Sequence, residues 1–153
     1  MKFFVITTLF LLLFSACSSQ NAFSRFNISH EHAKSEENIL SAKIYHNKNV
    51  LGVVSCVYLN AVMPQKYQDA EYFYVYLYSK KGTDNLSFML NNISAINIKE
   101  LEVNNEFINL TASNVDWQRY YLIKFKTQGE ILVFKTKIAQ FTSSPMIFKK
   151  DNE

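Results

Sequence analysis

Residues 71–78 read Glu71-Tyr72-Phe73-Tyr74-Val75-Tyr76-Leu77-Tyr78. Successive side chains of a β-strand point to opposite faces of its sheet, so the segment predicts a strand with two different faces. One face carries only apolar groups, those of Phe73, Val75 and Leu77, and suits a protein core. The other face is a ladder of four phenols about 20 Å long at the spacing of a strand.

The tyrosine ladder has two interpretations. Tyrosine is rigid and amphipathic, and is favoured on surfaces that bind a partner while staying soluble. On that interpretation the candidate binding face consists of Tyr72, Tyr74, Tyr76 and Tyr78. Alternatively, the rings pack against cross-strand neighbours or lie under a loop, with only their hydroxyl groups reaching water. The sequence leaves both interpretations open.

Other segments of the chain have the same strand character. Runs rich in Val, Ile, Tyr and Phe recur near residues 39–46, 50–60, 86–90, 95–103, 106–112, 118–127, 130–140 and 145–149. The chain has only three Gly and two Pro, so asparagines must supply most of the left-handed turn positions between these runs. We therefore expect an all-β fold, a sandwich of about seven to nine strands.

The segment from Asn114 to Ile123 suggests a narrower assignment. Asp116 is followed four residues later by Tyr120, at the entry to a late predicted strand. This arrangement resembles the corner before strand F of immunoglobulin-like sandwiches, where the tyrosine hydroxyl bonds back to the backbone. The resemblance implies an immunoglobulin-like variant, although Leu122 stands where immunoglobulin domains have their second cysteine.

The first seventeen residues have the pattern of an export signal. Lys2 precedes a run from Phe3 to Phe14 without an ionisable group. The run is shorter than the roughly 20 residues that a membrane-spanning helix needs, and it fits the apolar region of a secretory signal peptide. Phe14-Ser15-Ala16-Cys17 then resembles the lipobox of bacterial lipoprotein precursors, with Phe14 where that family usually has Leu.

The resemblance implies cleavage before Cys17 and attachment of fatty acyl chains to this cysteine. It divides the chain into a signal peptide (1–16), a lipidated tether (17–37) and a β-sandwich domain (38–153). Ser18 stands where an Asp would resemble an inner-membrane retention signal, which favours the outer membrane. The alternative is an ordinary signal peptide cut after Ala16, with Cys17 an incidental thiol.

Composition excludes several classes of function. Loss of Lys2 with the signal lowers the net formal charge from +3 to +2, and no cluster of Lys or Arg is longer than a pair. We therefore expect no nucleic-acid partner. The sequence also lacks a Gly-x-Ser-x-Gly elbow, a His-Glu-x-x-His motif and a Gly-rich phosphate loop, so we expect no catalytic residues, metal or cofactor. Cys56 lies in an apolar run and is expected to be a buried small hydrophobic residue.

These observations lead to one functional prediction and one alternative. We expect a lipid-anchored binding or adhesion module of the cell envelope without catalytic activity, facing the periplasm or the exterior. Its partner would be a protein or glycan of the envelope or of a host surface. The alternative is a small barrel-like carrier that encloses an apolar ligand or lipid.

Overall fold

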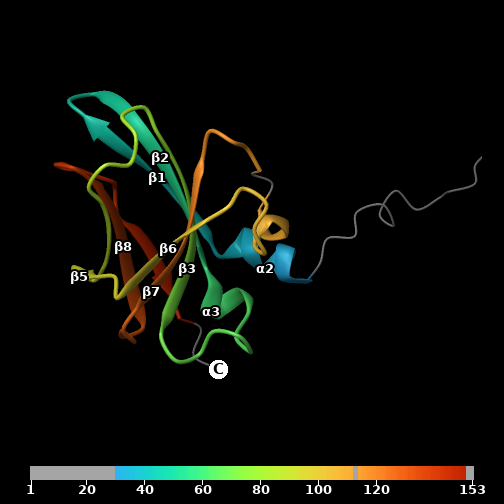
Figure 1. Ribbon diagram of the computed structural model, residues 1–153. Helices are drawn as coiled ribbons and strands as arrows, with labels where there is room; N and C mark the ends of the chain where they lie inside the picture. Colours follow the sequence, from blue (N-terminus) through green and yellow to red (C-terminus); the bar gives the residue numbers. More distant parts are fainter. Residues whose placement is uncertain (1–29, 112–113, 151–153) are drawn as a thin grey trace, which may run out of the picture.

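The computed structural model describes residues 30–111 and 114–150. They form two antiparallel sheets that pack face to face (Figure 1). The first sheet has the order β1-β2-β3-β7-β6, made of β1 Ile39–His46, β2 Asn49–Tyr58, β3 Glu71–Ser79, β7 Arg119–Phe125 and β6 Asn97–Leu101. The second has the order β10-β8-β4-β5, with β9 paired to β8; its strands are β10 Met146–Lys149, β8 Ile131–Ile138, β4 Leu86–Leu90, β5 Ile93–Ser94 and β9 Phe141–Thr142.

This architecture confirms the predicted all-β sandwich. The described residues contain ten strands, above the seven to nine expected, because β5 and β9 are two-residue strands. On one side of the sandwich the sheets approach each other through a bridge between Ile44 and Ser143. On the other side they end in β6 and β5, which are not paired with one another, so the two sheets stay unclosed.

The core lies between the sheets. Phe73, Val75 and Leu77 are at most 1% exposed and face it, as the alternating pattern predicts. Phe88, Phe134 and Phe148 of the second sheet fill the space opposite, and the Phe73 ring lies 4.9 Å from the Phe134 ring between centroids. Cys56 is fully buried in the same cluster, which confirms its expected role as a hydrophobic residue.

Asparagine supplies most of the left-handed turn positions. Asn47, Asn85, Asn91 and Asn92 all have positive φ. Asn91 and Asn92 join β4 to β5 in a two-residue turn, and positive φ at both positions is the signature of a type I′ hairpin turn. Ala139, with φ of 51°, is the only described residue with an aliphatic side chain in this region of backbone space.

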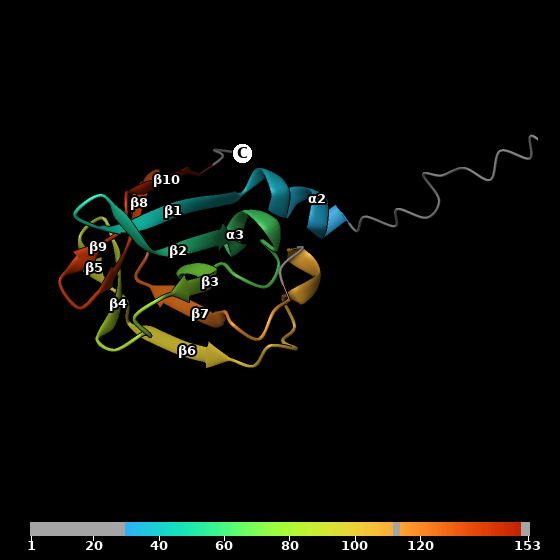
Figure 2. The same cartoon turned by 90° about the horizontal axis from the view of Figure 1, so that it is seen from above.

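Three short helices cover one end of the first sheet on its outer side, away from β8. They are α2 His30–Glu37, α3 Leu59–Val62 and the 3₁₀ helix η2 Ile108–Leu110. Figure 2 shows α2 and α3 together at this end of the molecule. A strand was expected near residues 106–112, and this prediction is wrong. The 3₁₀ turn places Phe107 and Leu110 on one side, where both are buried against the sheet.

Helix α2 belongs to the folded unit. Ser35 is 1% exposed, and its hydroxyl donates hydrogen bonds to the carbonyls of His32 and Leu110. Helix α2, which lies within the predicted tether of residues 17–37, is thus tied to η2 through Ser35. The predicted signal peptide, Cys17 and the first part of the predicted tether lie outside the described residues. None of the described helices is both long enough and apolar enough to span a membrane.

Candidate functional site

The tyrosine strand β3 is covered over most of its outer face. Tyr74 is fully buried, so the prediction that it belongs to an exposed binding face is wrong. Its ring lies 5.1 Å from that of Phe107, which precedes η2, and 6.3 Å from that of Tyr120. Tyr72 and Tyr76 are half-buried against the same second hydrophobic cluster. The interpretation in which the rings lie under a loop therefore describes this part of the ladder.

Burial changes the chemistry of the covered phenols. The loss of solvent contact raises the pKa of Tyr74 to about 12 and also raises the pKa of Tyr76. These hydroxyl groups therefore stay neutral to a higher pH than that of an exposed tyrosine. They contribute packing area to the sheet and no charge.

The opposite end of this outer face stays open to solvent. There Tyr78 is half-buried, like Tyr72 and Tyr76, and pairs across the strands with Val53, which is 38% exposed. The ring of Trp117 meets Tyr78 edge to face, with centroids 5.3 Å apart and planes at 89°, and Trp117 is 62% exposed. We call Val53, Tyr78 and Trp117 the Trp117 patch; the exposed Lys43 borders it, opposite Val53.

Sequence reasoning found Tyr78 but missed the rest of this patch. Trp117 is the only tryptophan of the chain and stands in a polar segment between predicted strands. A large aromatic residue in such a segment is a signal of surface recognition. The contact of Trp117 with Tyr78 joins residues 39 positions apart, and only the pairing of β3 with β7 brings them together.

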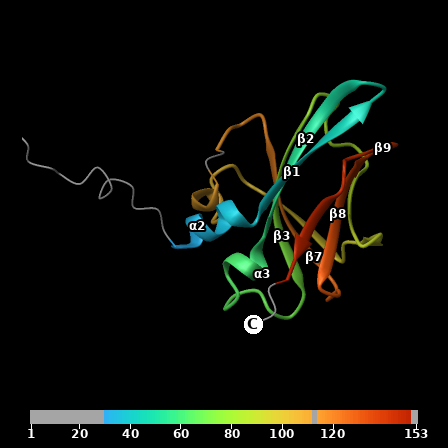
Figure 3. The same ribbon diagram turned by 180° about the vertical axis from the view of Figure 1, so that it is seen from behind.

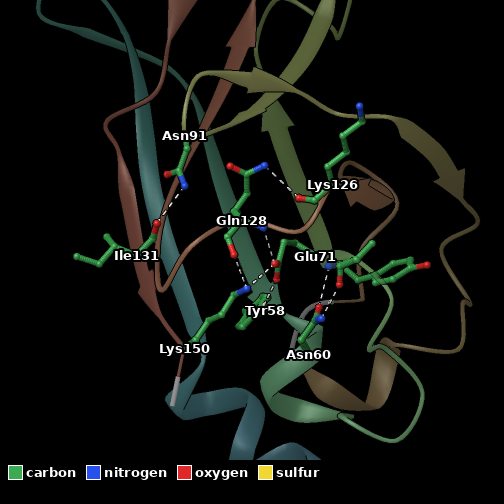
Figure 4. Close-up of polar contacts among 10 residues, drawn as sticks. Tyr58, Asn60, Glu71, Asn91, Lys126, Gln128, Ile131 and Lys150 are labelled. Carbon is green, nitrogen blue, oxygen red and sulfur yellow. Dashed lines mark hydrogen bonds and ion pairs between the residues drawn. The ribbon is translucent and has the colours of Figure 1, made fainter. Parts of the chain in front are cut away.

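A second polar arrangement surrounds Glu71 at the other end of β3 (Figure 4). Glu71 is 1% exposed, and its Oε2 accepts a hydrogen bond of 2.6 Å from the Tyr58 hydroxyl. Its Oε1 accepts from the Gln128 backbone N–H at 2.9 Å and pairs with Lys150 Nζ at 2.5 Å. Lys150 Nζ also donates to the Gln128 carbonyl at 2.8 Å. We call Glu71, Tyr58, Gln128 and Lys150 the Glu71 centre.

The Glu71 centre joins the two sheets. Tyr58 ends β2 and Glu71 begins β3 in the first sheet, whereas Lys150 follows β10 in the second. Burial, together with the neighbouring carboxylate, raises the pKa of Tyr58, so its hydroxyl stays a proton donor. Both carboxylate oxygens have donors, as a buried charge requires. The arrangement suits a structural clamp, because a carboxylate held by three donors has little capacity left for a substrate.

Two asparagine side chains reinforce the same end of the molecule. The Asn60 amide donates to the Ala70 carbonyl at 2.6 Å and accepts from the Tyr72 N–H at 2.8 Å. The Asn91 amide likewise contacts the start of β8, where it donates to the Ile131 carbonyl and accepts from the Val133 N–H. Each amide substitutes for a missing neighbouring strand, since it satisfies one backbone donor and one backbone acceptor.

Metal binding has no support in the part of the chain that the structure describes. Within residues 30–111 and 114–150, no group of three or more His, Cys, Asp or Glu side chains could hold an ion. A comparison with protein-family models, curated proteins and solved structures finds no match. The function of this chain is therefore inferred from its sequence and geometry.

Proposed function

We propose that this protein is a lipid-anchored binding module of the cell envelope, which recognises a protein or glycan partner through the Trp117 patch and catalyses no reaction. The observation that carries this proposal is the exposure of Trp117 in a fixed position. Tryptophan and tyrosine contribute disproportionately to binding energy at interfaces. A tryptophan ring left 62% exposed on a folded surface is available for such a contact.

The segment that carries Trp117 is held in place before any partner arrives. The Val115 N–H and carbonyl both bond to the Tyr120 hydroxyl, at 2.9 and 3.1 Å. The Gln118 N–H donates to the Val115 carbonyl at 3.2 Å, which closes a turn around Trp117. A binding residue that is already ordered loses less conformational entropy on association. This preorganisation supports a recognition role for the patch.

The anchor rests on the sequence Phe14-Ser15-Ala16-Cys17. With Cys17 acylated, the roughly 12 residues before His30 could span at most about 40 Å. The domain would thus remain close to the outer membrane, facing the periplasm or the exterior. Cys17→Ala should stop both cleavage and the uptake of labelled fatty acid. Normal cleavage and acylation of this variant would contradict the proposed lipid anchor. The binding proposal would be unaffected by that result.

Two alternatives have less support. Against an enzyme, Glu71 is the only buried carboxylate among the described residues, and its oxygens already have three donors. Against a carrier of a large apolar ligand, the space between the sheets is filled by side chains such as Phe73, Phe88 and Phe134. Interdigitated cores of this kind leave few voids larger than a water molecule.

Photo-crosslinking in the native envelope tests the binding proposal. A photoreactive phenylalanine analogue is placed at position 117 of the full chain, and in a control variant at Ile147 of β10, which is 54% exposed on the other sheet. We expect a discrete adduct from position 117 and none from position 147. Equal labelling at both positions, or none at 117, would contradict the proposal.

A further inference from the structure

A pocket of about 250 Å³ opens at the end of the sandwich where three turns meet. The turns are those between β1 and β2, between β3 and β4, and between β8 and β9. Figure 3 shows β9 close to the strand ends of β1 and β2 at this end of the molecule. The pocket lies on the inner side of the first sheet and is separate from both the Trp117 patch and the Glu71 centre.

Most of the pocket wall is aliphatic and aromatic, and the polar Ser79 and Gln140 also line it. Ile44 and Ile138 are at most 6% exposed and form its deep part, and Leu51 and Phe141 complete it. Pockets for drug-sized ligands measure roughly 300–1,000 Å³. A pocket of this volume therefore suits a smaller molecule with an apolar part of a few carbons.

Two opposite charges stand at the mouth of the pocket. Lys81 Nζ lies 5.4 Å from the centroid of the Phe141 ring, which places the ammonium group over the aromatic wall. Asp84 lines the pocket from the same β3–β4 loop. Among the described residues, no ion pair within 4.0 Å involves either side chain, so Lys81 and Asp84 form no salt bridge with each other.

The backbone at the pocket is also unusual. Ala139 lines it with φ of 51°, in the two-residue turn that joins Ile138 to Phe141. This conformation is unfavourable for a residue with a Cβ, and such residues concentrate at functional sites. The Ala139 N–H donates to the Asn85 carbonyl at 3.4 Å, which ties the strained turn to the loop that carries Lys81 and Asp84.

We propose that this pocket binds a small zwitterion with an apolar body, of the class of the aliphatic α-amino acids. The carboxylate of the ligand pairs with Lys81, its ammonium group pairs with Asp84, and its side chain lies against Ile44, Leu51 and Phe141. A ligand with a single charge would leave one of the two rim charges without a partner. A zwitterion pairs with both, and the pocket then distinguishes it from a plain amine or a plain acid.

The test uses calorimetry on the full chain with three matched probes. They are L-leucine, isopentylamine, which lacks the carboxylate, and 4-methylpentanoate, which lacks the ammonium group. Because each rim charge is exposed, we expect leucine to bind about fivefold more tightly than either analogue. Lys81→Gln should weaken leucine and 4-methylpentanoate by about that factor and leave isopentylamine unchanged. Asp84→Asn should weaken leucine and isopentylamine and leave 4-methylpentanoate unchanged.

Two exposed residues that do not line the pocket, Lys99 of β6 and Glu102 just beyond it, provide the control variants. Lys99→Gln and Glu102→Gln remove the same charges far from the pocket and should change none of the three affinities. Absence of leucine binding at roughly 10 mM, or equal weakening of all three probes by both rim variants, would overturn the proposal. All four substitutions are at exposed positions, so the fold itself should be preserved.

Discussion

The Tyr120 hydroxyl accepts a hydrogen bond from the Val115 N–H at 2.9 Å and donates one to the Val115 carbonyl at 3.1 Å. Tyr120 stands at the start of β7 and is 1% exposed. The tyrosine hydroxyl thus returns to the backbone five residues upstream, which is the kind of contact that the resemblance at Asp116–Tyr120 implies; the immunoglobulin-like assignment itself stays a prediction. The contact also fixes the segment that carries Trp117.

Tyr120→Phe should therefore lower the free energy of unfolding by about 1–2 kcal/mol, since it removes the hydroxyl partner of the part-buried Val115 N–H and one of the two donors to the Val115 carbonyl. Denaturant midpoints measure the loss. Tyr78→Phe is the matched control, because the Tyr78 ring is half-buried and its hydroxyl takes no part in the contact with Val115; this variant should stay within about 0.5 kcal/mol of the unaltered chain. Equal losses in the two variants would refute the structural role of the corner.

Tyr74 and Tyr78 lie on one strand face in different surroundings. Tyr74→Ser removes a fully buried ring and should cost about 3–5 kcal/mol, as large-to-small core substitutions do. Tyr78→Ser removes a half-buried ring that borders solvent and should cost less, while it weakens partner capture through the Trp117 patch. Chemical denaturation of both variants checks this. Similar midpoints for the two would mean that the covering segment around Phe107 does not protect Tyr74.

The strand itself could be predicted from alternation, because the core face of β3 depends only on the local order of residues. The burial of Tyr74 under a loop could not be predicted in this way. Phe107 lies 33 positions further along the chain, and its approach depends on η2, a segment whose apolar residues resemble a strand in sequence. The Glu71 centre was missed for the same reason, since Glu71 and Lys150 are 79 residues apart. The residues next to a carboxylate in the sequence do not indicate that a distant strand will bury it.

The Glu71 centre should make a larger contribution to stability than an exposed ion pair. Glu71→Gln keeps the shape of the side chain but leaves the Lys150 ammonium group without its anion, so we expect a loss of about 3 kcal/mol. The control is Glu106→Gln, which breaks the exposed pair with Lys66 and should cost less than about 1 kcal/mol. Thermal or denaturant unfolding distinguishes the two. A small loss at Glu71 would show that the sheets do not depend on this clamp.

Two glycines provide a test of the packing of β2 against β3. A Cβ on Gly52 would lie 2.5 Å from the Tyr78 carbonyl oxygen, a backbone atom that moves only with its strand. Gly52→Ala should therefore destabilise the protein by about 1–3 kcal/mol. Gly129→Ala meets nothing within 4 Å and should be neutral or stabilising by up to about 1 kcal/mol. Denaturant midpoints that fall together for both variants would contradict the close approach at Gly52.

Alkaline pH should unfold the protein through its buried phenols. Burial raises the pKa of five of the nine tyrosines above the ordinary value of about 10; they are Tyr58, Tyr67, Tyr74, Tyr76 and Tyr121. Above pH 10 the unfolded chain releases these protons and the folded chain retains them. The unfolded state then binds fewer protons, so stability falls as pH rises.

For Tyr74, whose pKa is about 12, the loss occurs between about pH 10 and pH 12. Each such phenol contributes at most about 1.4 kcal/mol per pH unit in this window. Unfolding free energies measured across the window should therefore fall less steeply in Tyr74→Phe than in the unaltered chain, whatever the baseline stability of the variant. The ultraviolet absorbance of phenolate gives the independent check. If all nine tyrosines ionised together near pH 10 while the sheets stayed intact, the buried positions of these five side chains would be wrong.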